Sequence, residues 1–221
     1  MNTLSAVATV LGLVVVAMAT PPNVSSGRKP ETLQEKRWAT AAIRKDKSST
    51  VEWVANRILR NKKRYEQVAR QTGVPWYAIA GLHNMESSLS FRHHLHEGSP
   101  LSGRTRYVPK GRPKSGSPPF TWEESAKDAL KYDRMHTVRW KEVDNTLYRV
   151  EAYNGLGYLK YHKDVPSPYL WSGTQLYKRG KYVSDGKWSS TAISKQMGVG
   201  AIWIRLMEKG VSLPEQFKQL R

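Results

Sequence analysis

A carboxylate stands in the apolar stripe of a predicted helix, within the segment GVPWYAIAGLHNMESSLSF at residues 73–91. Ile79, Leu82, His83 and Glu86 recur at helical spacing, so with about 3.6 residues per turn they share one face. Burial on this face disfavours the charged form of the carboxylate and raises its pKa, and the negative end of the helix dipole acts the same way. We therefore expect Glu86 to hold a proton near neutral pH, as a general acid must. The alternative is a surface glutamate at a fraying helix end.

Helical periodicity predicts further elements on both sides of this segment. A helix capped by Thr50 carries an apolar stripe and ends at Gly73, and Pro75 opens the next helix at its first turn. Near the C-terminus, a helix over residues 191–207 stops before Gly210. The stripe of the first helix consists of Val51, Val54, Ile58, Tyr65 and Val68, and that of the last helix of Ile193, Met197, Ile202 and Leu206.

Shorter signals complete the prediction of the fold. The sequence TWEE at residues 121–124 is a capping box that opens a helix through Leu130 or as far as His136. Residues 181–188 form a β-hairpin around an Asp-Gly turn, and residues 31–47 contain a weakly amphipathic helix. The chain shows no internal repeat and no βαβ alternation. The predicted fold is therefore mainly α, in the α+β class, with a small β-hairpin element.

The N-terminal region differs in composition from the rest of the chain. Residues 1–27 carry no charged side chain, and residues 4–19 are an almost unbroken apolar run that ends in Ala-Met-Ala. This pattern predicts a signal peptide over residues 1–19, and the run is also long enough to remain as a membrane anchor. We expect a basic, polar linker with a possible short helix over residues 20–48, and one domain over residues 49–221.

Charge and cysteine content restrict the partners and the chemistry. The formal net charge of +18 attracts polyanions such as nucleic acid, teichoic acid, lipopolysaccharide or anionic lipid, and by itself does not choose among them. The chain has no cysteine, which excludes disulfides and zinc sites with cysteine ligands.

Several motifs in a fixed order carry a resemblance to a known superfamily. The segment EAYNG at residues 151–155 ends a short predicted helix, and four motifs precede it. These are PWY at 75–77, ESS at 86–88, HLHEGSPL at 94–101 and the run from Val108 to Leu130. Together they resemble the catalytic core of the soluble lytic transglycosylases and the wider goose-type lysozyme superfamily, and more closely the lysozyme-like endolysins of bacteria and their phages. The resemblance covers residues 73–200 and implies a lysozyme-like single domain.

The resemblance implies a reaction and a site. Glu86 would protonate the oxygen of the β-1,4 bond between N-acetylmuramic acid and N-acetylglucosamine in peptidoglycan. Assisted by the substrate acetamido group, attack by the 6-hydroxyl would give an anhydro product, as in a lytic transglycosylase, whereas attack by water would make the chain a muramidase. No cofactor and no metal are implied. The residues expected to support the substrate are Ser87, Ser88, His96, Tyr153 and Asn154.

Partners and location follow from the same resemblance together with the charge. We expect the chain to be an exported monomer, periplasmic or secreted, that acts on peptidoglycan glycan strands. Anionic wall polymers or a membrane surface are possible further partners, and specific nucleic-acid binding is not expected because few aromatic residues interleave with the basic ones. Some relatives use an uncleaved anchor that later leaves the membrane, and the Ala, Gly and Thr content of residues 1–19 permits this.

A second carboxylate is not apparent. Hydrolytic glycosidases pair their acid with another carboxylate, and the candidates here are Glu97, Asp164 and Asp185. Ser99 stands where relatives tend to have Asp, which leaves the choice between hydrolysis and transglycosylation open.

Two further features have competing interpretations. The stretch over residues 104–120 is rich in Pro, Gly, Lys and Arg and is either a lip that meets substrate carboxylates or a solvated basic loop. The run HHLHE at residues 93–97 offers metal-ligand types, but adjacent histidines do not easily face one metal and no distant ligands support them. We expect these histidines to form loop hydrogen bonds and to line the cleft.

A non-catalytic function is the alternative for the whole chain. A basic protein could keep a lysozyme-like fold and bind cell walls or other polyanions without cleaving them. The retention of Glu86 within its motif favours the enzyme. A third hypothesis, a basic nucleic-acid-binding protein, predicts salt-sensitive binding to duplex DNA and no sugar cleavage.

Overall fold

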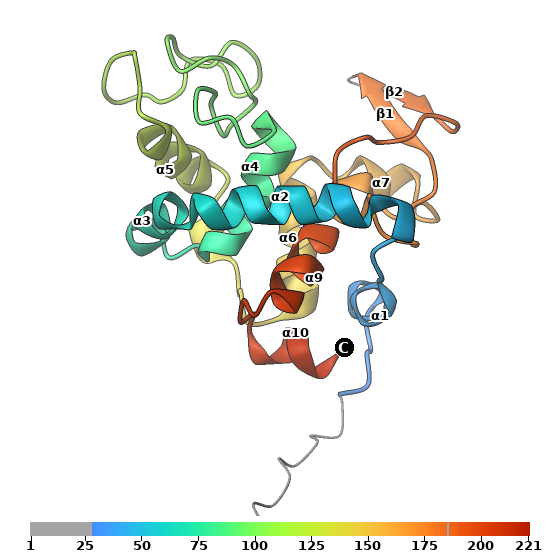
Figure 1. Cartoon of the computed structure of the whole chain (residues 1–221). Coiled ribbons are helices and arrows are strands. Elements are labelled where there is room, and N and C mark those ends of the chain that lie inside the picture. The colour runs from blue at the N-terminus through green and yellow to red at the C-terminus, as the bar shows by residue number, and fades with distance from the viewer. Residues whose placement is uncertain (1–27, 185) are drawn as a thin grey trace, which may run out of the picture.

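A computed structural model describes residues 28–184 and 186–221 and shows a mainly α-helical domain with one small antiparallel sheet (Figure 1). The predicted signal peptide over residues 1–19 lies outside the described residues. Within the described part of the chain, no helix is long and apolar enough to cross a membrane. The elements are α1 (Leu33–Thr40), α2 (Ser48–Arg60), α3 (Lys62–Thr72), α4 (Trp76–Ser87), α5 (Trp122–Tyr132), α6 (Val143–Tyr153), α7 (Gly157–Tyr161), α8 (Pro168–Trp171), β1 (Lys181–Ser184), β2 (Lys187–Ser189), α9 (Val199–Glu208) and α10 (Glu215–Gln219), with 3₁₀ turns at Lys45–Lys47 and Met135–Thr137.

Helix α1 belongs to the packed domain. A capping box between Thr32 and Glu35 starts it, because the Thr32 hydroxyl accepts from the Glu35 amide at 3.2 Å. Trp38 is fully buried, and its indole nitrogen donates to the carbonyl of Phe217 at 2.9 Å. The predicted short helix is therefore present, but the predicted domain start at residue 49 is too late, since α1 packs into the same core as the C-terminal helix.

Helices α2 and α3 replace the single helix predicted up to Gly73. Their shared apolar stripe is buried as predicted. The helix breaks at Asn61, whose side-chain amide donates to the Arg57 carbonyl at 2.9 Å. Thr50 is not the cap, because α2 already begins at Ser48. Gly73 ends α3 in the left-handed conformation with φ 72°, which glycine adopts without strain.

Helix α4 runs through the centre of the domain. All residues from 77 to 84 are buried, and α4 packs against α3 and α9. The approach of α9 is close, because a Cβ at Gly81 would lie 2.8 Å from a methyl group of Val199. Glycine at this position therefore lets two central helices come together.

Helix α9 is shorter than the sequence predicts. It begins at Val199, and the side chain of Ile193, which was placed in its apolar stripe, is 60% exposed. The cause is tertiary, since Gly198 packs against the backbone of Leu170 so closely that any Cβ would overlap the Leu170 carbonyl. Residues 191–198 instead run as irregular chain from the hairpin to this contact.

Local signals predict the remaining elements better. The capping box at the start of α5 is formed as predicted, with the Thr121 amide donating to the Glu124 carboxylate at 2.8 Å. The hairpin is also present, with Lys181 opposite Ser189 and Tyr182 opposite Trp188. Residues 102–120 form an irregular loop between α4 and α5. In Figure 1 this loop and the hairpin project on the same side of the domain, on either side of the C-terminal end of α4.

Because Gly198 has no room for a side chain, Gly198→Ala should lower the free energy of unfolding by about 2 kcal/mol. Urea denaturation followed by far-ultraviolet circular dichroism measures the change. Gly103→Ala is the matched control, because a Cβ there meets nothing within 4 Å, and it should leave stability almost unchanged. Equal stabilities of the two variants would contradict the packing described for α9.

Candidate active site

Glu86 occupies the last turn of α4, where the helix stops abruptly. Ser88 and Leu89 both adopt left-handed conformations, with φ 51° and 60°. The Ser88 amide still donates to the Asn84 carbonyl at 3.1 Å and the Leu89 amide to the His83 carbonyl at 3.2 Å. These bonds satisfy the carbonyls at the helix end and turn the chain away, so that Glu86 is left at the edge of the core.

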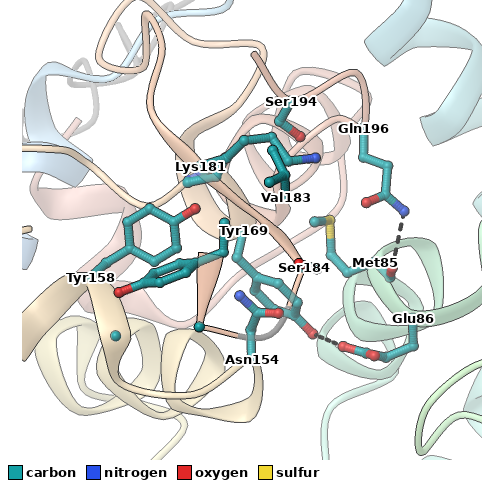
Figure 2. A pocket seen from close by; sticks show the side chains of 14 residues that line it. Met85, Glu86, Asn154, Tyr158, Tyr169, Lys181, Val183, Ser184, Ser194 and Gln196 are labelled. Atoms are coloured by element: carbon teal, nitrogen blue, oxygen red, sulfur yellow. Dashed lines mark hydrogen bonds between the residues drawn. The ribbon is translucent and has the colours of Figure 1, made fainter. Parts of the chain in front are cut away.

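A pocket of about 380 Å³ opens in front of the Glu86 side chain (Figure 2). Its walls come from the end of α4, the turn between α6 and α7, the start of α8, the hairpin and the segment before α9. The lining residues are Met85, Glu86, Asn154, Gly157, Tyr158, Pro168, Tyr169, Lys181, Tyr182, Val183, Ser184, Gly186, Ser194 and Gln196.

Tyr169 fixes the Glu86 carboxyl. Its hydroxyl donates to Glu86 Oε1 at 2.7 Å, and the tyrosine is almost fully buried. Burial raises the pKa of Glu86 to about 8; the hydrogen bond from Tyr169 opposes this shift, and the negative charges of Asp133 and Glu97 add to it. At neutral pH the carboxyl therefore holds a proton beside an open pocket, as the sequence pattern predicts.

Tyr169 itself gave no signal in the sequence. It lies in the single helical turn of α8, which Ser167 caps by accepting a hydrogen bond from the Tyr169 amide at 3.3 Å. A Ser-Pro helix start could have indicated the turn. Tyr169 is 83 residues from Glu86 in sequence, and only the tertiary fold brings the two side chains together.

Asp133 is a second carboxyl near Glu86 that the sequence did not indicate. It follows α5 and lines a neighbouring cavity of about 150 Å³ with Arg149 and Tyr153. Burial raises the pKa of Asp133 to about 6, while the positive charge of Arg149 opposes this shift. The Tyr153 hydroxyl donates to the Leu95 carbonyl at 3.1 Å. Tyr153 thus lines this neighbouring cavity, is not part of the described lining of the Glu86 pocket, and bonds to the loop of residues 94–99.

The loop of residues 94–99 packs directly against the backbone of Glu86. Gly98 has φ 81°, and a Cβ there would lie 2.6 Å from the Glu86 carbonyl oxygen. Glu97 is held by the hydroxyl and amide of Ser99, and its other oxygen is buried without a hydrogen-bond partner among the described residues. Of the predicted second carboxylates, Glu97 therefore lies close to Glu86. Asp164 is exposed and outside the pocket lining, and Asp185 lies outside the described residues.

The other predicted site residues divide into two groups. Asn154 lines the pocket with Glu86, as predicted. Ser87, Ser88 and His96 are not part of the described lining. Ser87 bonds weakly to the His83 carbonyl at 3.4 Å, and Ser88 is the exposed cap of α4.

Each histidine of the run at residues 93–96 has its own partner. His93 Nδ1 lies 2.7 Å from the Ser90 hydroxyl, and His94 bonds to the Ser125 hydroxyl and the Gly103 carbonyl, both at 2.8 Å. Nε2 of His96 lies 2.8 Å from Asp128 on α5, and burial lowers the pKa of this histidine. The run fastens the loop to α5, and among the described residues no three acidic or histidine side chains gather around one point where a metal could bind.

Aromatic packing holds the wall opposite Glu86. The ring of Tyr182 meets Tyr158 and Trp188 edge to face, and the ring of His162 stacks on Trp188 at 3.5 Å. Gly157 makes room for Tyr182, since a Cβ there would lie 2.9 Å from its ring. These contacts fix the hairpin over α7 and so set the width of the pocket.

The pocket combines a proton donor with hydrogen-bonding groups. Asn154, Ser184, Ser194 and Lys181 supply amide, hydroxyl and ammonium groups, and Figure 2 shows the hairpin residues across from Glu86. Gln196 closes one side, where its amide donates to the Met85 carbonyl at 3.0 Å. Such a site can bind a ligand rich in hydroxyl and amide groups and protonate one of its oxygens.

Comparisons with protein-family models, with curated proteins and with solved structures find no match to this chain. The chemistry of the pocket is therefore inferred from its own residues, above all from Glu86 and Tyr169.

Glu86→Gln should stabilise the protein at high pH. In the unfolded chain Glu86 loses its proton near pH 4.5, whereas in the folded protein it keeps it up to about pH 8. Ionisation thus favours the unfolded state increasingly over this window. The gain should be about 2 kcal/mol at pH 9, below the full value of such a shift because the carboxyl is partly solvated, and should vanish near pH 4.

Urea denaturation at pH 4 and pH 9 measures this difference. Glu215→Gln, at an exposed position on α10, should show no such dependence on pH. A stability difference between Glu86→Gln and the unmodified chain that is constant with pH would contradict a protonated Glu86 in the folded state.

Proposed function

We propose that this protein cleaves the β-1,4 bond between N-acetylmuramic acid and N-acetylglucosamine in peptidoglycan, with Glu86 as the general acid. The observation that carries the proposal is the Glu86 carboxyl, which holds its proton at neutral pH and faces a polar pocket under a hydrogen bond from Tyr169. Glycoside cleavage requires such a proton donor next to the leaving oxygen. The order of motifs around Glu86 supports the same reaction.

The pocket suits a sugar chain. Carbohydrates present hydroxyl and acetamido groups at the edges of their rings and apolar faces between them. Asn154, Ser184 and Ser194 offer partners for the polar groups, and the partly exposed ring of Tyr182 offers a flat surface for the faces. Lys181 adds a positive charge that suits the carboxylates carried by peptidoglycan.

Tyr169 has a defined part in this mechanism. Its hydroxyl already donates to Oε1, so the proton of the Glu86 carboxyl is left for the other oxygen. When that proton moves to the glycosidic oxygen, the hydrogen bond from Tyr169 stabilises the carboxylate that remains. The substrate acetamido group then assists departure of the leaving sugar.

Two carboxyls near Glu86 could serve a hydrolytic route. Glu97 adjoins the Glu86 backbone through Gly98, and Asp133 acts on Glu86 electrostatically. Without such a base, the 6-hydroxyl of the substrate would attack and give the anhydro product. We propose glycoside cleavage by either route. The exported, periplasmic or secreted location predicted from residues 1–19 would place the enzyme at this substrate.

Glu86→Gln should abolish the release of muropeptides from purified peptidoglycan, because a glutamine cannot donate the proton; a loss of at least about 1,000-fold is expected. Mass spectrometry of the released material measures it with the chain from residue 20 onward. Glu215→Gln is the control and should release muropeptides like the unmodified chain.

The products also distinguish the routes. Anhydromuramyl ends indicate transglycosylation, and reducing ends that have gained water indicate hydrolysis. Equal release by Glu86→Gln would overturn the role of Glu86. Wall binding without release by the unmodified chain would favour the non-catalytic alternative.

Activity should fall as the pH rises through about 8, because Glu86 loses its proton there. Asp133→Asn should move this midpoint to lower pH by about half a pH unit, since removal of its negative charge makes the ionised Glu86 less unfavourable. The pH profile of muropeptide release checks this, with Asp144→Asn, in the first turn of α6, as the control. An unchanged midpoint in Asp133→Asn would contradict the coupling of the two carboxyls.

A further inference from the structure

The basic loop between α4 and α5 is closed at its base. Thr105, which is buried, donates its amide to the Arg112 carbonyl at 2.8 Å, and its hydroxyl accepts from the Arg112 amide at 2.8 Å. The Gly111 amide donates to the Thr105 carbonyl at 2.9 Å. Residues 106–111 therefore project as a small closed loop, which we name the tip loop.

A charged anchor fastens the base of the tip loop to the domain. Arg112 binds Asp128 on α5 with two hydrogen bonds of 2.8 and 2.5 Å, and Asp128 also lies 2.8 Å from His96 Nε2. Bidentate arginine–carboxylate pairs fix direction as well as distance. The tip loop is thus held out from a rigid base.

The tip loop exposes apolar side chains among cations. Tyr107 is 70% exposed and Val108 is 86% exposed, the largest exposed fraction among the exposed large hydrophobic side chains of the described residues. Arg106, Lys110 and Lys114 flank them and are exposed, and within the described part of the chain none of these three forms an ion pair with a carboxylate. Two adjacent apolar side chains in water surrounded by uncompensated positive charge need an explanation outside the folded domain.

We propose that the tip loop is a membrane anchor that docks on an anionic phospholipid bilayer, with Tyr107 and Val108 inserted at the interface and the surrounding cations on the lipid phosphates. Charge complementarity carries the choice of partner, because each basic residue near an anionic surface strengthens binding about fivefold. Tyrosine is favoured at the level of the lipid headgroups, and valine gains binding free energy only where its side chain leaves water.

Other occupants fit the tip loop less well. No residue of the tip loop lines the pocket of Glu86, so it is not a wall of the candidate active site. Nucleic acids and glycan strands are bound through aromatic faces and hydrogen bonds, which Val108 cannot provide. The exposed side chain of Val108 gains contacts with a partner that has an apolar interior.

A single fluorescent label tests the insertion. The chain has no cysteine, so Val108→Cys can be labelled uniquely with an environment-sensitive nitrobenzoxadiazole group. Its emission should shift to the blue with vesicles of phosphatidylglycerol and phosphatidylcholine, and should not shift with phosphatidylcholine alone. Tyr161→Cys is the control, because Tyr161 is 74% exposed next to Lys160 but lies on α7, away from the tip loop.

A binding measurement completes the test. Tyr107→Ser together with Val108→Ser should weaken sedimentation with anionic vesicles about tenfold or more, whereas Tyr161→Ser should not. Circular dichroism confirms that both variants are folded, and muropeptide release reports on Glu86 independently. A label at residue 108 that shows no shift with anionic vesicles, or an equal shift at residue 161, would overturn the proposal. A shift with soluble polyphosphate but not with vesicles would assign the tip loop to a soluble polyanion instead.

Discussion

Helix α4 is buried over most of its length, and the rest of the domain is arranged around this constraint. A helix that is apolar on all sides must lie in the interior, and here α3 and α9 pack against it while Gly81 lets α9 approach. Its last turn reaches a space that solvent can enter. Glu86 is in that turn, so the same burial that stabilises the fold also places one carboxyl at the boundary between core and pocket.

The cost of this arrangement is electrostatic. Burial favours the protonated form of Glu86, and the two nearby carboxyls, Asp133 and Glu97, add to the effect. Tyr169 opposes it with a hydrogen bond but does not cancel it. The surrounding groups therefore keep the pKa of Glu86 near neutral pH, so that a small change in the local electric field decides whether it is protonated. Acid catalysis uses this property, whereas stability alone would not select it.

Local patterns in the sequence were reliable where the physics is local. The capping box at Thr121, the stop at Gly73 and the helix that carries Ile79, Leu82 and His83 depend on neighbours within one or two turns, and the structure confirms them. The late start of α9 depends on packing of Gly198 against distant backbone, and periodicity could not reveal it. The break at Asn61 leaves the apolar stripe in register, so periodicity did not reveal it either. In the candidate site, Glu86 and Asn154 were predicted to lie together and both line the pocket. Tyr169 and Asp133 were missed because they approach Glu86 only through the tertiary fold.

Motif residues need not contact a ligand to matter for a site. His94 and His96 bind Ser125 and Asp128 of α5, and the loop between them and Ser99 lies against the Glu86 backbone. Asp128 in turn holds Arg112 and with it the tip loop. Helix α5 is therefore a common support, which fixes the backbone beside Glu86 on one side and the exposed tip on the other. A substitution in α5 would disturb the backbone beside Glu86 and the tip loop together. The order of these motifs along the chain therefore reflects their packing on one helix as much as the chemistry of the pocket.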